Sequence, residues 1–251
     1  MAIRRDLVVF GEPALQKALR AVGSLWQARS GTRVNVFVAP TDLSYAQIER
    51  GARCDLIFAL ADATTETAAR AKIIDGGTVR PVLRNGLVLI GPRTRQAMIA
   101  NATLADITRL IRGNRLAIAN PDRDPAGARA FDLLRNIGII VDHSNRTVVV
   151  AESSAGVVSF LATGKARLGI VYSSDAPSES VMASLPVSDQ PPIEYVVALA
   201  RDPQLDTQPF LAFLRSTAVT AAFKTAGLLP IEDNVLPRRA GHAPLQDASS
   251  Q

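Results

Sequence analysis

Three hydroxyl groups follow an apolar segment in the second half of the chain. The segment LGIVYSSDA (168–176) begins with residues typical of a buried strand and then reaches Tyr172, Ser173 and Ser174. Ligands of α/β proteins sit at the carboxyl ends of strands, so these groups stand where a ligand would be held. Tyr172 has no base beside it in the sequence, which favours hydrogen bonding to a ligand over acid catalysis.

Small and hydroxyl residues also gather where other strands give way to helices. With the tyrosine segment there are five such places, at residues 10–15, 39–44, 120–130, 151–158 and 171–176. The first turn of a helix carries free backbone N–H groups and partial positive charge, which favour an anion. At any single junction, helix capping is the simpler explanation of these residue types. Their recurrence favours a small oxyanion that is held by neutral donors from several helices.

Other kinds of chemistry find little support in the sequence. The two histidines, His143 in a polar turn and His242 near the C-terminus, lack metal-ligand spacing. The one cysteine, Cys54, excludes an internal disulfide and a cysteine-based metal cluster. The chain has no nucleophile elbow, phosphate-binding loop or dinucleotide fingerprint. We therefore expect no enzyme activity, no cofactor and no metal ion coordinated directly by side chains.

Composition excludes several further classes of protein. Hydrophobic residues make up 47% and charged residues 20%, which allows a packed core and argues against disorder over most of the length. The net charge of +5 is scattered, its densest clusters (Arg4-Arg5 and Arg238-Arg239) lie near the ends, and aromatics make up only 5%, so we expect no nucleic-acid partner. No apolar run reaches the ~18 residues of a membrane span. The start, MAIRRDLVVF, lacks a signal-peptide pattern, which suits either a cytoplasmic protein or the mature form of an exported one.

Strands and helices alternate along the chain. Strands are predicted at 6–10, 33–39, 54–60, 85–92, 115–121, 147–153, 168–174 and 193–200. Helices are predicted at 13–31, 44–52, 64–74, 104–111, 125–138 and 154–166, with a helix pair over 208–227 that breaks near Ser216. This alternation predicts an α/β fold with parallel strands and right-handed crossovers.

The alternation restarts near residue 87, which divides the chain into two lobes. We expect lobe I to comprise 1–86 plus 193–235, lobe II to comprise 87–192, and 236–251 to form a flexible tail. The chain would then cross between the lobes twice, near 84–87 and 192–196. Two parallel-type sheets joined by two crossing strands describe a hinge around a cleft.

The sequence also resembles a known family over residues 7 to about 230. The matching stretches, in the family's order, are LVVFGEPALQKAL, QIERGARCDLIFA, LRNGLVLIGP, RLAIANPDRDPAGARAFDLLRNIG, GKARLGIVYSSDA, IEYVVAL and FLAFLRSTAVTAAFKTAGLLP. The most specific of them are DPAG and LGIVYSSDA. With these stretches the chain resembles the molybdate-binding periplasmic proteins of ABC transporters, which have the two-lobed type II periplasmic binding protein fold.

The resemblance implies a ligand site made of neutral hydrogen-bond donors. Carried over position by position, its members are Ala14, Thr41, Ala126, Ser153, Ser154 and Tyr172. Two of the family's serines are lost, because Ala14 and Pro40 stand in their places, and proline has no N–H to donate.

Two carboxylates depart from the family pattern in the first-lobe loops. Glu12 and Asp42 stand where the family usually has small or hydroxyl residues. An ionised carboxylate close to a bound dianion would repel it. Three explanations stay open: the carboxylates point outward as helix caps, they contact a different ligand, or the site is degenerate. They are accordingly candidates for a second layer around the site or for altered specificity.

The resemblance implies a function without chemistry. We expect a monomeric, periplasmic solute-binding component of an ABC transporter that binds molybdate or tungstate and delivers it to the transporter's membrane subunits. One alternative is the same fold with another small ligand, organic or polyhydroxylated. Another is an intracellular ligand-sensing domain of the same fold.

Overall fold

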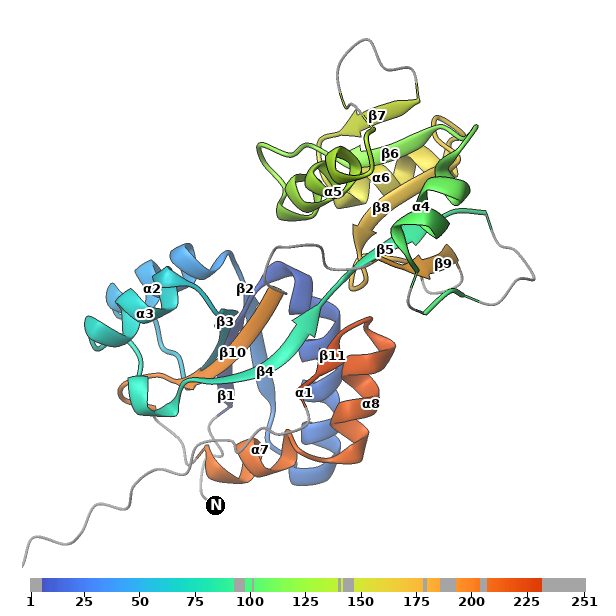
Figure 1. The fold of residues 1–251 in the computed structure, drawn as a ribbon. Helices are drawn as coiled ribbons and strands as arrows, with labels where there is room; N and C mark the ends of the chain where they lie inside the picture. The colour runs from blue at the N-terminus through green and yellow to red at the C-terminus, as the bar shows by residue number, and fades with distance from the viewer. Residues whose placement is uncertain are drawn as a thin grey trace, which may run out of the picture.

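The computed structural model describes residues 6–92, 98–100, 102–139, 141, 147–177, 180–185, 193–203 and 207–231 (Figure 1). Both histidines, the two arginine pairs near the ends and the expected tail at 236–251 lie outside the described residues. The described chain forms two bodies, each built on its own sheet. We call the body with the six-stranded sheet lobe I and the body with the five-stranded sheet lobe II.

Lobe I contains a mixed sheet in the order β11-β4-β10-β3-β1-β2. Its strands are β1 (Leu7–Gly11), β2 (Val34–Val38), β3 (Leu56–Leu60), β4 (Arg80–Asn85), β10 (Ile193–Leu199) and β11 (Leu229–Pro230). Strand β1 pairs in parallel with β2 and β3, whereas β10 is antiparallel to both β3 and β4. The carboxyl ends of β1, β2 and β3 therefore meet at one edge of lobe I.

Helices cover both faces of this sheet. They are η1 (Pro13–Leu15), α1 (Gln16–Ser30), α2 (Thr41–Glu49), α3 (Ala63–Arg70), η2 (Gly76–Thr78), α7 (Gln208–Phe213) and α8 (Thr217–Thr225). Helices α1, α7 and α8 lie on one side and α2 and α3 on the other (Figure 1). On the first side Trp26 packs edge-on against Phe210 with 5.4 Å between ring centroids, inside the larger apolar core of the lobe.

Lobe II repeats the arrangement with the strand order β7-β6-β8-β5-β9. Its strands are β5 (Leu87–Ile90), β6 (Leu116–Ala119), β7 (Val148–Ala151), β8 (Leu168–Tyr172) and β9 (Val181–Ser184), and its helices are α4 (Leu104–Ile111), α5 (Pro125–Asn136) and α6 (Ser154–Ala162). Strand β6 is parallel to β7 and β8, so the carboxyl ends of these three strands share an edge. Strand β5 is antiparallel to β8 and β9.

The architecture is α/β, as expected, but each sheet is mixed and not purely of parallel type. The antiparallel strands lie where the chain passes directly between the lobes, because β5 follows β4 with no helix between them and β10 enters lobe I from lobe II. Three strands were not predicted: β4, with a proline and two arginines in RPVLRN, the four-residue β9, and the two-residue β11. The helix pair breaks as expected, with Ser216 as the N-cap of α8.

The crossing from β4 to β5 is held by hydrogen bonds to the end of β8. Asn85 donates from Nδ2 to the Ser174 hydroxyl over 2.9 Å, and the Ser173 N–H donates to the Gly86 carbonyl over 2.8 Å. The segment with Tyr172 is therefore fixed directly beside the first crossing between the lobes.

Candidate ligand-binding site

In lobe I the central contact joins Glu12, just after β1, to Thr41, the first residue of α2. The Glu12 carboxylate accepts a hydrogen bond from the Thr41 N–H over 2.5 Å and a second one from the Thr41 hydroxyl. The Thr41 hydroxyl oxygen also accepts a bond from the Leu60 N–H at the end of β3, over 3.0 Å. Thr41, which is buried, thereby connects the carboxyl ends of β1 and β3 to the start of α2.

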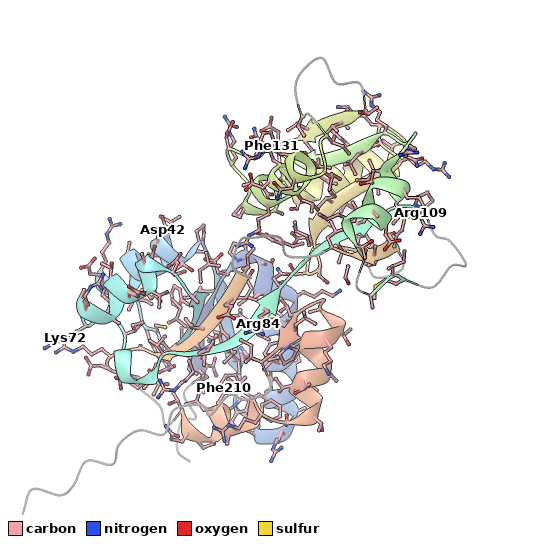
Figure 2. The ribbon with its side chains drawn as sticks, in the orientation of Figure 1. Asp42, Lys72, Arg84, Arg109, Phe131 and Phe210 are labelled. Atoms are coloured by element: carbon pink, nitrogen blue, oxygen red, sulfur yellow. The ribbon has the colours of Figure 1, made fainter. Side chains whose placement is uncertain are left out.

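The surroundings of Glu12 disfavour its charge. Burial raises the pKa of the Glu12 carboxyl above its ordinary value, the two bonds from Thr41 lower it, and the charges of Asp62 and Asp42 raise it. Asp42 itself is exposed in the first turn of α2, at the upper edge of lobe I (Figure 2), where it lines a surface pocket with Tyr45. Of the two unusual carboxylates, only Glu12 contacts a predicted site residue.

In lobe II one carboxylate joins the first turns of two helices. Asp124 is the N-cap of α5, and its Oδ1 accepts from the N–H groups of Ala126 over 2.8 Å and Gly127 over 3.3 Å. Its Oδ2 accepts from the N–H of Ser154, the first residue of α6, over 2.9 Å and from the Ser154 hydroxyl over 3.2 Å. The expected donors at Ala126 and Ser154 are thus brought together and share one carboxylate.

Ser153 has a different role from its neighbour. It is exposed and acts as the N-cap of α6, where its hydroxyl oxygen accepts from the Gly156 N–H over 3.3 Å. Capping accounts for this side chain. The bonds between Asp124 and Ser154 do not involve Ser153.

Tyr172, the last residue of β8, is only 7% exposed, and its hydroxyl has no hydrogen-bond partner among the described residues. Burial raises the pKa of this phenol, and the charge of Arg129 on α5 opposes the rise. The charges of Asp124 and Asp175 raise it further. A buried phenol without a partner is costly unless a ligand or water completes its hydrogen bond.

Groups from both lobes act on Tyr195, which lies on β10. Burial raises its pKa to about 12; a bond from Asn85 opposes the rise, and the charge of Glu12 from lobe I and of Asp175 from lobe II add to it. Asn85 donates to the Tyr195 hydroxyl over 3.4 Å. Asp175 keeps part of its surface exposed, yet its pKa is raised by burial of the remainder and by the charge of Asp124.

Apolar contacts also bring the predicted residues of the two lobes together. Ala126 and Tyr172 of lobe II belong to the same hydrophobic cluster as the core of lobe I, and Ala14 packs against that cluster. Ala126 and Tyr172 thus lie where lobe II meets the apolar core of lobe I, with Ser154 tied to Ala126 through Asp124.

Several residues of this region were not predicted as site residues, namely Asn85, Asp124, Arg129, Asp175 and Tyr195. Asp124 carries a sequence signal as a helix cap, because aspartate followed by proline is typical of a helix start. Its second set of bonds, to Ser154, depends on how α5 and α6 pack, which no local pattern reveals. The same holds for Asn85 and Tyr195, which meet only after β10 returns to lobe I.

Within the described parts of the chain, no three His, Cys, Asp or Glu side chains are grouped so that they could hold a metal ion. Across those same residues, no helix has the length and apolar character to cross a membrane.

Comparison with known proteins places this arrangement in a family. The family model for bacterial extracellular solute-binding proteins matches residues 7–229, which is most of the chain. The protein therefore belongs to the bacterial extracellular solute-binding protein family.

Relatives and solved structures agree with this assignment. The molybdate-binding protein ModA of Escherichia coli is 28% identical over 232 residues, which cover 90% of each chain. The substrate-binding domain of a putative molybdenum ABC transporter from Clostridium difficile superposes with a TM-score of 0.76 at 22% identity, covering 90% of this chain and 99% of that one. The periplasmic molybdate-binding protein of Azotobacter vinelandii gives 0.66 at 20% identity, covering 89% and 99%. These structural likenesses confirm the two-lobed α/β fold.

Proposed function

We propose that this protein is the solute-binding component of an ABC transporter and that it binds molybdate or tungstate between its two lobes. The observation that carries the proposal is the bonding of Asp124, whose two oxygens take up N–H donors from the first turns of α5 and α6. A pair of helix starts that holds one oxyanion, here a carboxylate, has the donors and the partial positive charge to hold another.

The proposed mechanism is binding without a chemical step. The N–H groups of Ala14, Thr41, Ala126 and Ser154 would replace the hydration shell of the anion, and the Tyr172 hydroxyl would find its missing acceptor. Arg129 supplies a positive charge within reach of the Tyr172 hydroxyl. Hydrogen bonds to a charged acceptor are stronger than neutral ones, so a few well-placed donors suffice.

Transport would follow from closure of the two lobes. A ligand that contacts both lobes stabilises the closed arrangement, because it makes contacts there that the open one lacks. The membrane subunits of the transporter would recognise this closed form. By its family and by relatives described as periplasmic or as lipoproteins, we infer that the protein works outside the cytoplasmic membrane.

Thermal unfolding with added anions tests the proposal. A ligand at a hundred times its dissociation constant stabilises the folded state by about 2.7 kcal/mol, which raises the melting temperature of a chain of this size by roughly 5–10 °C. We expect such a shift with ~1 mM molybdate or tungstate and a smaller one with sulfate, whose smaller radius fits the same donors less well. No shift with any oxyanion, together with a shift caused by an organic solute, would reject the proposed ligand.

A further inference from the structure

Three of the backbone donors that would bind the oxyanion, those of Thr41, Ala126 and Ser154, are already engaged by carboxylates of the chain itself. Glu12 accepts from the N–H and the hydroxyl of Thr41, and Asp124 accepts from the N–H groups of Ala126 and Ser154. An incoming anion meets two negative groups that stand where its own oxygens would go.

Asp124 does more than an ordinary cap. A capping aspartate satisfies donors of its own helix, as its Oδ1 does at Ala126 and Gly127. Its Oδ2 reaches a second helix and accepts from the N–H and the hydroxyl of Ser154, which is buried. The Ser154 hydroxyl also bonds to the carboxylate of Asp175. Both oxygens are therefore used as the oxygens of a bound oxyanion would be.

Glu12 occupies the corresponding position in lobe I. It reaches from the end of β1 to the start of α2, so it caps a helix to which it does not belong. The N-cap position of α2 is Pro40, whose side chain makes no capping hydrogen bond. Glu12 thus supplies from another loop the acceptor that the local sequence lacks.

We infer that Glu12 and Asp124 are internal competitors of the ligand, so that an oxyanion binds by displacing both carboxylates. The inference rests on the proposed function, because it names the residues that set the affinity of that same site. It has two consequences. Removing either negative charge strengthens binding, and protonating Glu12 does the same, so affinity rises as the pH falls toward the raised pKa of Glu12.

The charged groups around Glu12 explain this pH dependence. Around Glu12 lie Asp42 on α2, Asp62 before α3 and Tyr195 on β10, and none of these is a cation. Burial and the two aspartates raise the pKa of Glu12, so its neutral form becomes populated as the pH falls through a window above 4.5.

Around Asp124 the neighbouring groups come from three elements and the segment after β8. They are Ser154 on α6, Tyr172 on β8, Arg129 on α5 and Asp175 after β8. Asp175 adds another negative charge beside that of Asp124. The positive charge of Arg129 acts on the Tyr172 phenol, as do the charges of Asp124 and Asp175. A dianion arriving there is opposed by two aspartates and favoured by one arginine.

Calorimetric titration of the intact chain with molybdate tests the inference, with wild type, Glu12→Gln, Asp124→Asn and the double variant. Asparagine is as good an N-cap as aspartate, so Asp124→Asn removes the charge and keeps the start of α5. Glu152→Gln is the matched control, because it removes one charge from an exposed side chain in the loop before α6. The melting temperature without ligand verifies that each variant is folded.

We expect each neutral variant to bind at least about tenfold more tightly than wild type near pH 8, since a charged acceptor no longer holds the donors. Wild type should gain affinity as the pH falls from about 8 toward the raised pKa of Glu12, and Glu12→Gln and the double variant should lose most of that dependence. Glu152→Gln should behave like wild type in both respects.

The outcomes separate the inference from the proposed function. If wild type binds molybdate and the neutral variants bind it equally or more weakly, the inference is wrong and the proposed function stands. The inference also fails if the double variant keeps the full pH dependence. If neither wild type nor any variant binds molybdate or tungstate at either pH, the proposed function fails and the inference falls with it.

Discussion

Tyr172 is the side chain whose surroundings are least complete in the described structure. Its ring is packed into the apolar cluster where the lobes meet, and its hydroxyl has no partner among the described residues. Burial keeps the phenol protonated well past neutral pH, because its pKa is raised. At physiological pH the group is therefore a hydrogen-bond donor in need of an acceptor, and a bound oxyanion would supply one.

Replacing Tyr172 by phenylalanine tests this role. The substitution keeps the ring and removes the hydroxyl, so we expect the affinity for molybdate to fall by about 1–3 kcal/mol, the usual cost of leaving a buried acceptor on a ligand unpaired. The stability of the ligand-free protein should hold or improve, since an unpartnered polar group is lost. Calorimetric titration and thermal unfolding of the variant measure the two effects.

Tyr45→Phe is the matched control for this experiment. The Tyr45 hydroxyl is bonded to the Thr65 hydroxyl over 2.9 Å on the far side of lobe I, away from Tyr172. Its loss should lower stability by roughly 0.5–1.5 kcal/mol and leave the affinity unchanged. Equal affinities for wild type and Tyr172→Phe would remove Tyr172 from the site.

Among individual residues, the sequence pointed to hydrogen-bond donors of the candidate site but not to the carboxylate of Asp124, which accepts from two of them. Thr41, Ala126, Ser154 and Tyr172 were expected from their places at strand ends and from the family resemblance. Asp124 was not, although it stands in the DPAG motif itself, because a cap is a complete local explanation for such a residue. Its contact with Ser154 spans 30 residues and depends on the packing of two helices.

At the scale of elements, the first turn of α5 is placed by a very close approach to the end of β6. A Cβ on Gly127 would come within 2.4 Å of the Ala119 carbonyl oxygen and 2.8 Å of the Asn120 carbonyl oxygen. These are backbone atoms and cannot rotate away. Only glycine lets the helix begin so near the strand that Asp124 and Ala126 reach α6.

Gly127→Ala should therefore destabilise lobe II. We expect a loss of about 1–3 kcal/mol, as for other overpacked sites, which exceeds the gain of up to ~1 kcal/mol in helix propensity. In thermal unfolding this corresponds to a fall of roughly 2–10 °C.

Gly156→Ala is the matched control for this effect, because Gly156 occupies the same position in the first turn of α6. A Cβ there would lie 3.2 Å from the Cβ of Ala151, so a shift of a few tenths of an ångström would relieve the contact. Its stability should stay within about 0.5 kcal/mol of wild type or rise slightly. A Gly127→Ala variant as stable as Gly156→Ala would contradict the proposed packing constraint.

The regular elements were largely predictable and the crossing strands were not. Helical periodicity and caps located α4, α5 and α8, and continuous apolar runs located β1, β3, β6 and β8. Strand β4, RPVLRN, shows no regular alternation of apolar and polar residues, and it lies between the short edge strand β11 and the buried β10. Its pairing partners lie more than 100 residues away in the sequence, so no local pattern could predict them.

At the scale of the whole molecule, two parallel-strand edges are turned toward each other by the direct passage from β4 to β5 (Figure 1). Asn85 stands at this passage and is 3% exposed. It bonds to Ser174 at the end of β8 in lobe II and to Tyr195 on β10 in lobe I. One buried amide therefore helps to set how the two lobes are oriented.

We expect Asn85→Ala to loosen that orientation. Removing the amide leaves the Ser174 hydroxyl and N–H without this partner, at a cost of about 1–3 kcal/mol in the free energy of unfolding. The lobes should then sample more separated arrangements, so small-angle scattering should give a larger radius of gyration for the ligand-free variant than for wild type. Saturating molybdate should bring both proteins to the same compact form, with a weaker affinity in the variant because part of the binding free energy is used to restore the orientation.

Asn114→Ala controls for the loss of an asparagine amide, since the Asn114 amide donates to nearby carbonyls at the end of α4, those of Leu110 and Arg112. It should leave both the radius of gyration and the affinity unchanged. If Asn85→Ala matches wild type in scattering with and without ligand, the lobes are oriented by their apolar contact at Ala126 and Tyr172 and not by the bonded crossing. In that case the orientation of the lobes would depend on the surface where the ligand is proposed to bind, and not on the β4–β5 passage.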